Sequence, residues 1–361
     1  MIIGEKIFEI DTPALWVDLD IMEANIAYMA EKMKEAGVNW RPHTKGIKIP
    51  AIAHKLMDAG AIGVTCAKLS EAEVLASAGI KDILIANEVI GEKKIRRLIA
   101  LCAHADVMVA VDDMSNVREI SSAASAAGRR IRILVELNIG MERAGLDPGK
   151  SAVDFVKEIL PLPGIDFNGL MGWEGHVVDI TDPAEKKYVG EKAIHALVET
   201  AGMIRSESIP VGIVSCGGSG SYTIVGSIPG VTEIQAGGAI FGDITYRNWG
   251  AGTTPSLFVM TSVSSHAVPH RAIVDAGRKS MNGDIFMPLP NNIEGIELAW
   301  ISAEHGVLNV TDPNIQLKVG DKINFVVGYG DWTVFLHDRL LGVRDGKVEV
   351  VWDIQGRGKL T

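Results

Sequence analysis

Lys45 and two glycine-rich segments, Cys216–Ser221 and Gly237-Gly238, are the residues of this sequence whose types suggest chemistry. Lys45 follows a short strand-like run that Pro42 must end, because proline cannot donate to a ladder of hydrogen bonds. The lysine therefore lies in a loop before the next helical pattern, where α/β folds keep their functional groups. The glycines allow backbone N–H groups to approach an anion closely. We therefore expect an amine and a phosphate site.

An amine beside a phosphate site suits a phosphorylated aldehyde that is held as a Schiff base. Pyridoxal 5'-phosphate meets both requirements. A sugar-phosphate aldolase would meet them too. The residue types alone therefore leave the two chemistries open.

The elements that must position these residues form a regular series. From Val38 onward, eight strand-like segments are nearly all separated by helical patterns, and the strands are continuously apolar. Such strands are typical of a parallel sheet covered on both faces. Eight units in roughly 210 residues favour a closed, TIM-like (β/α)8 barrel, with an open doubly wound sheet as the alternative. Residues that follow the strands of a barrel meet at one mouth.

The pattern changes after Gly250, where strand-like segments follow one another without helices. Val334–Leu336 is one of the expected strands, and Asp345-Gly346 predicts a hairpin turn. We therefore predict an α/β barrel over residues 20–248 and a C-terminal all-β domain, residues 249–361, joined by residues 1–19. Within the barrel, Ser70 with Glu73 three residues later predicts a helix start.

Composition limits the partners. The net charge of −10 argues against nucleic-acid binding. No apolar run reaches the length of a membrane span, and the first residues lack the pattern of a signal peptide. We expect a soluble, cytoplasmic protein that acts on a small molecule and has no membrane partner.

Several motifs, in the same order along nearly the whole chain, resemble the D-threonine aldolase and D-serine dehydratase family of pyridoxal-phosphate enzymes. They include residues 41–45, 66–72, 87–89, 217–221, 233–237, 304–307 and 342–349. The segment Gly140–Gly145 also resembles part of the alanine racemases. The resemblance implies an alanine racemase-like barrel with a C-terminal β domain, and a homodimer.

The resemblance also implies roles for single residues. Lys45 would hold the cofactor, Arg143 would bond its phenolic oxygen, and Trp173 would contact its ring. A fixed cation at that oxygen would stabilise the phenolate. The phosphate would be bound by Gly218, Ser219, Gly220, Gly237, Gly238 and Tyr246.

One segment departs from the family pattern. The family binds a divalent metal through a histidine and, two residues later, an aspartate or cysteine; here Tyr329 and Asp331 stand at those positions. A neutral tyrosine is a poor ligand, because its phenol must first lose a proton. A metal on Asp331 would need help from His305 or from the substrate. Tyr329 could instead serve as an acid or base.

We therefore predict a lyase of D-β-hydroxy amino acids that cleaves Cα–Cβ to give glycine and an aldehyde. Its substrate would be D-threonine or 3-hydroxy-D-aspartate. A racemase or epimerase using Lys45 and Tyr329 is the alternative, as is a dehydratase of D-serine or hydroxyaspartate. A carrier of pyridoxal phosphate is the non-enzymatic alternative. The predicted catalytic residues are Lys45, Arg143, His305 and Tyr329.

Overall fold

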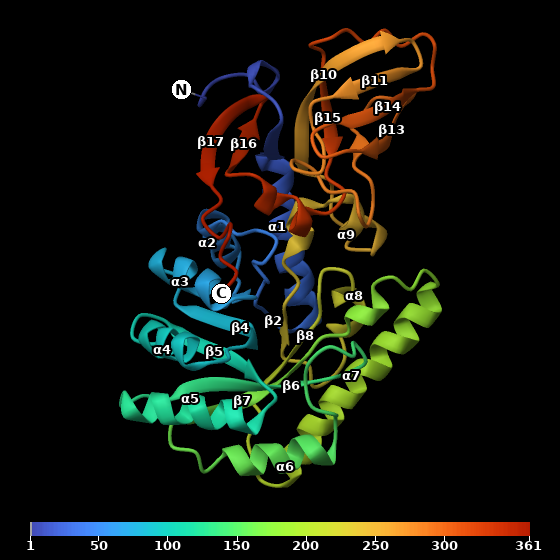
Figure 1. Ribbon diagram of the computed structural model, residues 1–361. Helices are drawn as coiled ribbons and strands as arrows, with labels where there is room; N and C mark the ends of the chain where they lie inside the picture. The colour runs from blue at the N-terminus through green and yellow to red at the C-terminus, as the bar shows by residue number, and fades with distance from the viewer. Residues whose placement is uncertain (1) are drawn as a thin grey trace. The chain divides into compact units, whose positions relative to one another are not determined.

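A computed structural model describes residues 2–361 and divides the chain into two compact units (Figure 1). The barrel unit comprises Met29–Lys45, Ile52–Gly237 and Lys359–Thr361. The β unit comprises residues 2–28, Gly46–Ala51 and Gly238–Gly358. Lys45 is therefore the last residue of the first barrel segment, before the chain returns to the β unit at Gly46.

Eight parallel strands form the barrel unit, in the order β2-β9-β8-β7-β6-β5-β4-β3. A bridge between His43 and Thr65 joins the first of these strands to the last, with Thr65 N donating to Pro42 O at 2.9 Å. The sheet therefore closes, as the apolar strands predicted. The strands are β2 (Asn39–Trp40), β3 (Val64–Cys66), β4 (Asp82–Glu88), β5 (Asp106–Val111), β6 (Ile131–Leu137), β7 (Ile165–Gly172), β8 (Ile213–Cys216) and β9 (Glu233–Ile234).

Helices follow most of these strands and pack outside the sheet (Figure 1). Each buries one apolar face, as Ile95, Leu98 and Ile99 do in α4. The helices are α1 (Leu19–Ala36), α2 (Pro50–Asp58), α3 (Leu69–Ser77), α4 (Glu92–Leu101), α5 (Met114–Ala126), α6 (Lys150–Ile159), α7 (Pro183–Ser206) and α8 (Tyr222–Val225), with the 3-10 turn η2 (Gly175–Val177).

The β unit is built on a second sheet, in which β1 pairs with both β10 and β16. The N-terminal strand therefore joins the C-terminal sheet, as predicted. Asp345 and Gly346 have positive φ and turn the hairpin between β16 and β17. The strands are β1 (Ala14–Asp18), β10 (Leu257–Val268), β11 (Arg271–Val274), β12 (Leu289–Pro290), β13 (Ile296–Ile301), β14 (Gly306–Val310), β15 (Lys322–Val326), β16 (Arg339–Arg344) and β17 (Lys347–Asp353).

Short helices complete the β unit: η1 (Ile7–Glu9), η3 (Gly238–Phe241), α9 (Ile244–Asn248), η4 (Gly330–Trp332) and η5 (Val334–Leu336). The predicted strand at Val334–Leu336 is wrong, because Leu336 N bonds locally to Thr333 O and forms a 3-10 turn. The predicted cap at Ser70 is also wrong. Helix α3 begins at Leu69, and Glu71 accepts from the N–H groups of Ala67 and Lys68.

None of the helices described is both long and apolar enough to cross a membrane.

Candidate active site

The Lys45 loop is held by short-range hydrogen bonds at the carboxyl end of the barrel. The backbone N–H of Lys45 donates to His43 Nδ1 at 3.3 Å. Thr44 donates twice to the Thr65 carbonyl, through its backbone N–H at 2.7 Å and its hydroxyl at 2.9 Å. These bonds fix the conformation of the loop that carries the lysine, at the point where the sheet closes.

Trp173 brings two of the predicted cofactor residues together. It follows β7, and both Lys45 Nζ and Arg143 Cζ lie over its ring, at 5.4 and 5.2 Å from the centroid. Cations within about 6 Å of an indole face are attracted by it. The structure thus groups Lys45, Trp173 and Arg143 at the carboxyl ends of β2, β7 and β6, where the sequence placed them.

The glycine-rich loop Gly217–Ser221 connects β8 to α8 and is tied to a buried carboxyl group. Glu174 accepts from the Ser221 hydroxyl at 2.5 Å and from Gly217 N at 3.3 Å. Burial raises the pKa of Glu174, although the Ser221 bond opposes the shift. Glu174 therefore organises this loop rather than facing solvent as a base. Ser219 and Gly220 are buried in the same loop.

The glycines of both segments are needed because their neighbours leave no room for a side chain. A Cβ on Gly218 would lie 3.1 Å from Trp173 Nε1. A Cβ on Gly237 would collide with the backbone of His43, two residues before Lys45. In the β unit, a Cβ on Gly238 would collide with the Tyr246 hydroxyl. In each unit, glycine therefore leaves the backbone uncovered beside a residue that the sequence assigns to the cofactor site.

An aromatic cluster in the β unit surrounds Tyr329, which is 7% exposed. The rings of Tyr246, Trp249 and Trp332 lie edge-on to it, with centroids 5.5, 5.8 and 5.5 Å away. Asp243 helps to position this cluster, because it accepts from the backbone of Tyr246 at 2.8 Å and from that of Gly330, next to Tyr329, at 2.6 Å. His305 lies outside this cluster, exposed in the turn between β13 and β14.

The donor set at Asp331 does not fit a divalent metal. Tyr246 donates its hydroxyl to Asp331 Oδ1 at 2.9 Å. Burial raises the pKa values of both Tyr246 and Tyr329, and the Asp331 charge raises them further, so both phenols keep their protons. Over residues 2–361, no three His, Cys, Asp or Glu side chains group as ligands. A protonated phenol is a poor ligand.

Two glutamates at the barrel mouth, one buried and one partly buried, were not assigned roles from the sequence. Glu136 is 3% exposed in β6, and its carboxylate lies 3.5 Å from Arg143 Nη2. Glu88 ends β4, and its Oε1 is buried without a hydrogen-bond partner. Glu136 follows the apolar run Ile133–Val135 one residue before the strand ends, which was the available signal.

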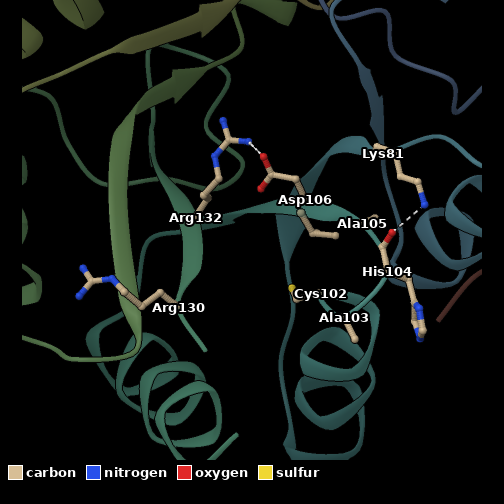
Figure 2. Close-up of a pocket in the computed structure, with 9 residues that line it drawn as sticks. Lys81, Cys102, Ala103, His104, Ala105, Asp106, Arg130 and Arg132 are labelled. Atoms are coloured by element: carbon tan, nitrogen blue, oxygen red, sulfur yellow. Dashed lines mark hydrogen bonds and ion pairs between the residues drawn. The ribbon is translucent and has the colours of Figure 1, made fainter. Parts of the chain in front are cut away.

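A separate cavity of about 350 Å³ lies at the amino ends of β4, β5 and β6 (Figure 2). The Lys45 loop lies at the carboxyl end of the barrel. The charged groups of the cavity are already engaged. Lys81 Nζ donates to the His104 carbonyl at 3.0 Å, and Arg132 pairs with Asp106 at 2.6 Å. This cavity contains none of the predicted site residues.

A closed parallel barrel with a lysine after one strand and glycine loops after the last two defines a class: barrel enzymes that hold a phosphorylated cofactor on a lysine. Comparison with known sequences agrees. Residues 17–245 match the family described as "Alanine racemase, N-terminal domain", and residues 256–343 match "Putative serine dehydratase domain". The chain belongs to this alanine racemase-like family.

Three relatives are similar to the chain over nearly its full length. A 3-hydroxy-D-aspartate aldolase from Paracoccus denitrificans (strain Pd 1222) is 37% identical, covering 97% of this chain and 93% of its own. A D-threonine aldolase from Arthrobacter sp is 35% identical, covering 98% and 95%. The crystal structure of D-threonine aldolase from Filomicrobium marinum matches with a TM-score of 0.96 at 36% identity, covering 99% and 98%.

Proposed function

We propose that this protein is a pyridoxal-phosphate-dependent lyase that cleaves D-β-hydroxy amino acids to glycine and an aldehyde. The observation that carries the proposal is the grouping of Lys45, Trp173 and Arg143 at the mouth of the barrel. The full-length relatives supply the reaction class, since their names are those of aldolases of 3-hydroxy-D-aspartate and D-threonine. Racemases are only distant relatives, such as an ornithine racemase at 21% identity.

The residues present fit pyridoxal phosphate. Lys45 would anchor the aldehyde, Arg143 would hold the ring oxygen, and Trp173 would lie against the ring. The phosphate would be bound by Gly218, Ser219, Gly220, Gly237, Gly238 and Tyr246. When bound, the cofactor supplies an electron sink for the bond that breaks at the substrate Cα.

The side chains must move two protons. The β-hydroxyl loses a proton as Cα–Cβ breaks, and Cα gains one to give glycine. We assign the transfer at Cα to Lys45, the amine at the mouth. We assign the β-oxygen to Tyr329 and Asp331, which stand at the positions of the family's metal ligands. Because its phenol stays protonated, Tyr329 would donate a hydrogen bond and Asp331 would accept the proton. His305 stays a predicted catalytic residue.

The test is an assay of purified protein with D-threonine and with 3-hydroxy-D-aspartate. We expect glycine and an aldehyde in equal amounts, and a visible cofactor band that Lys45→Ala removes. Lys93→Ala, on the exposed face of α4, is the matched control and should change neither. Release of ammonia would indicate a dehydratase, and loss of optical rotation without cleavage would indicate a racemase. A cofactor band without turnover would indicate a carrier.

The proposal routes no step through a divalent metal, because the donor set at Asp331 does not suit one. Thermal unfolding with and without Mn²⁺ tests this directly. We expect no shift for the wild type and a rise in the melting temperature for Tyr329→His, which supplies a neutral imidazole two residues from Asp331. Tyr188→Phe, in an exposed part of α7, controls for loss of a phenol. A wild-type shift that Asp331→Asn abolishes would contradict this assignment.

The family resemblance also predicts a homodimer. Sedimentation equilibrium of the holoenzyme should give twice the chain mass. A monomeric mass would contradict the prediction.

A further inference from the structure

Arg143 has a single carboxylate partner within ion-pair distance among the described residues, and that partner is buried. The guanidinium side chain is 53% exposed, whereas the Glu136 side chain is 4% exposed. Their nearest atoms are 3.5 Å apart, and the guanidinium also lies over Trp173. Glu136 is fixed in strand β6, while Arg143 belongs to the loop that follows. The buried carboxyl group in the strand is therefore placed to hold the exposed guanidinium of the loop.

Other acidic groups face Glu136 from the neighbouring strands. Glu88 reaches it from the end of β4, and Asp112 acts on it from the residue after β5. Asp112 also accepts from Gly145 N at 2.9 Å, within the loop of Arg143. Arg143 is the positive charge that acts on this group, so the cluster has more acid groups than its cation can balance.

Glu88 and Glu136 are two acidic groups whose charges act on each other, so ionisation of one disfavours ionisation of the other. Burial and then the charge of Glu88 raise the pKa of Glu136 to about 7, against the opposing effect of Arg143. Burial also raises the pKa of Glu88. Glu136 is therefore held in its neutral form below about pH 7.

We propose that Glu136, backed by Glu88, is a positioning residue that holds Arg143 against Trp173 and sets how much of its charge is left for an anionic ring oxygen. The inference rests on the proposed function, since it takes Arg143 as the partner of that oxygen. With a neutral Glu136, the guanidinium charge is available to the ligand. With an ionised Glu136, the carboxylate competes for the same charge and repels the anion.

Cofactor affinity measured against pH tests this proposal with purified apoenzyme and pyridoxal phosphate. The dissociation constant is read from the visible band at about pH 6 and about pH 8.5, on either side of the Glu136 transition. Glu136→Gln keeps an acceptor for Arg143 but cannot ionise. Glu142→Gln changes the same residue type beside Arg143 at an exposed position, where Glu142 accepts from Asn138, and is the matched control.

We expect the wild-type dissociation constant to rise between the two pH values by about fivefold more than that of Glu136→Gln, the size of one partly screened charge pair. Glu142→Gln should follow the wild type. In Glu88→Gln, the midpoint of the pH dependence of the dissociation constant should lie at a lower pH than in the wild type. The substitution removes a charge that disfavours ionisation of Glu136. This second variant keeps the test usable if Glu136→Gln fails to fold.

The proposal would be overturned if the dissociation constant depended equally on pH in the wild type and in Glu136→Gln. It would also be overturned if Glu142→Gln changed the pH dependence as much as Glu136→Gln does. Aldehyde release is measured separately on the wild type. An enzyme that binds the cofactor with the expected pH dependence but releases no aldehyde would refute the proposed reaction and leave the role of Glu136 standing.

Discussion

The barrel holds two arginine–carboxylate clusters at its opposite ends, and they differ in how completely their charges are paired. At the amino ends, Arg41 is 1% exposed and bonds Asp82 at 2.7 Å and Glu233 at 2.8 Å. At the carboxyl ends, Arg143 is half-exposed and lies 3.5 Å from Glu136. The first cluster has fixed, short bonds, and the second has a looser pair beside surplus acid.

The difference separates a structural role from a functional one. A buried arginine with two short carboxylate bonds cannot move without leaving charges unpaired. Ser215 adds a further donor to Glu233 at 2.8 Å. The Arg143 cluster keeps an unpartnered buried oxygen on Glu88 and a carboxyl group that titrates near neutral pH. Perturbed acids of this kind gather where a protein binds or transforms a ligand.

Replacing Arg41 should give the largest effect on stability. Arg41→Met leaves Glu233 buried without its cation, which costs about 3–5 kcal/mol of unfolding free energy. Urea unfolding followed by tryptophan fluorescence measures the loss. The double variant Arg41→Met/Glu233→Met should recover part of it. A single variant as stable as the wild type would show that the two clusters do not differ as described.

Replacing Arg143 should affect activity and not stability. Arg143→Lys keeps the charge but loses the planar fork, so we expect kcat/KM for aldehyde release to fall about 100-fold. Because the side chain is half-exposed, the unfolding free energy should change by less than about 1 kcal/mol. Kinetics and urea unfolding of the same preparation check both statements. A large loss of stability with normal turnover would reverse the assignment.

The acid pair should make stability depend on pH. The pKa of Glu136 rises from 4.5 to about 7 on folding, so the folded protein holds a proton that the unfolded chain has lost. This contribution to stability is present at low pH and is lost as pH rises through about 7. Glu136→Gln should therefore be more stable than the wild type by about 2 kcal/mol at about pH 8 and nearly equal at about pH 5. Urea unfolding at both pH values measures this, and a difference that does not change with pH would contradict it.

The barrel could be predicted because its strands are continuous apolar runs with helices between them, a pattern that follows from burial on both faces. The structure of short segments could not be predicted in this way. Val334–Leu336 is apolar like a strand, but three residues do not distinguish a strand from a 3-10 turn. The cap of α3 depends on Glu71 reaching back to Ala67 and Lys68, which competes with the equally suitable pattern at Ser70.

The candidate site likewise contains residues that could be predicted from the sequence and residues that could not. Lys45, Trp173 and Arg143 each follow a strand, so barrel geometry alone brings them to one end. Glu136 could not be assigned, because it lies inside the strand and its partners come from other elements. The pairing of Arg41 with Glu233 joins residues 192 positions apart, and no local pattern indicates it.

A third pair, on the surface, should give the smallest effect and test whether burial is the cause of the difference. Arg97 bonds Glu73 through two nitrogens, at 2.8 and 2.7 Å, with side chains 37% and 36% exposed. Its bonds are as short as those of Arg41, but water screens them. Glu73→Gln should therefore cost about 0.5 kcal/mol, and added salt should reduce that cost. A cost close to that of Arg41→Met would mean that bond geometry, and not burial, sets the stability of these pairs.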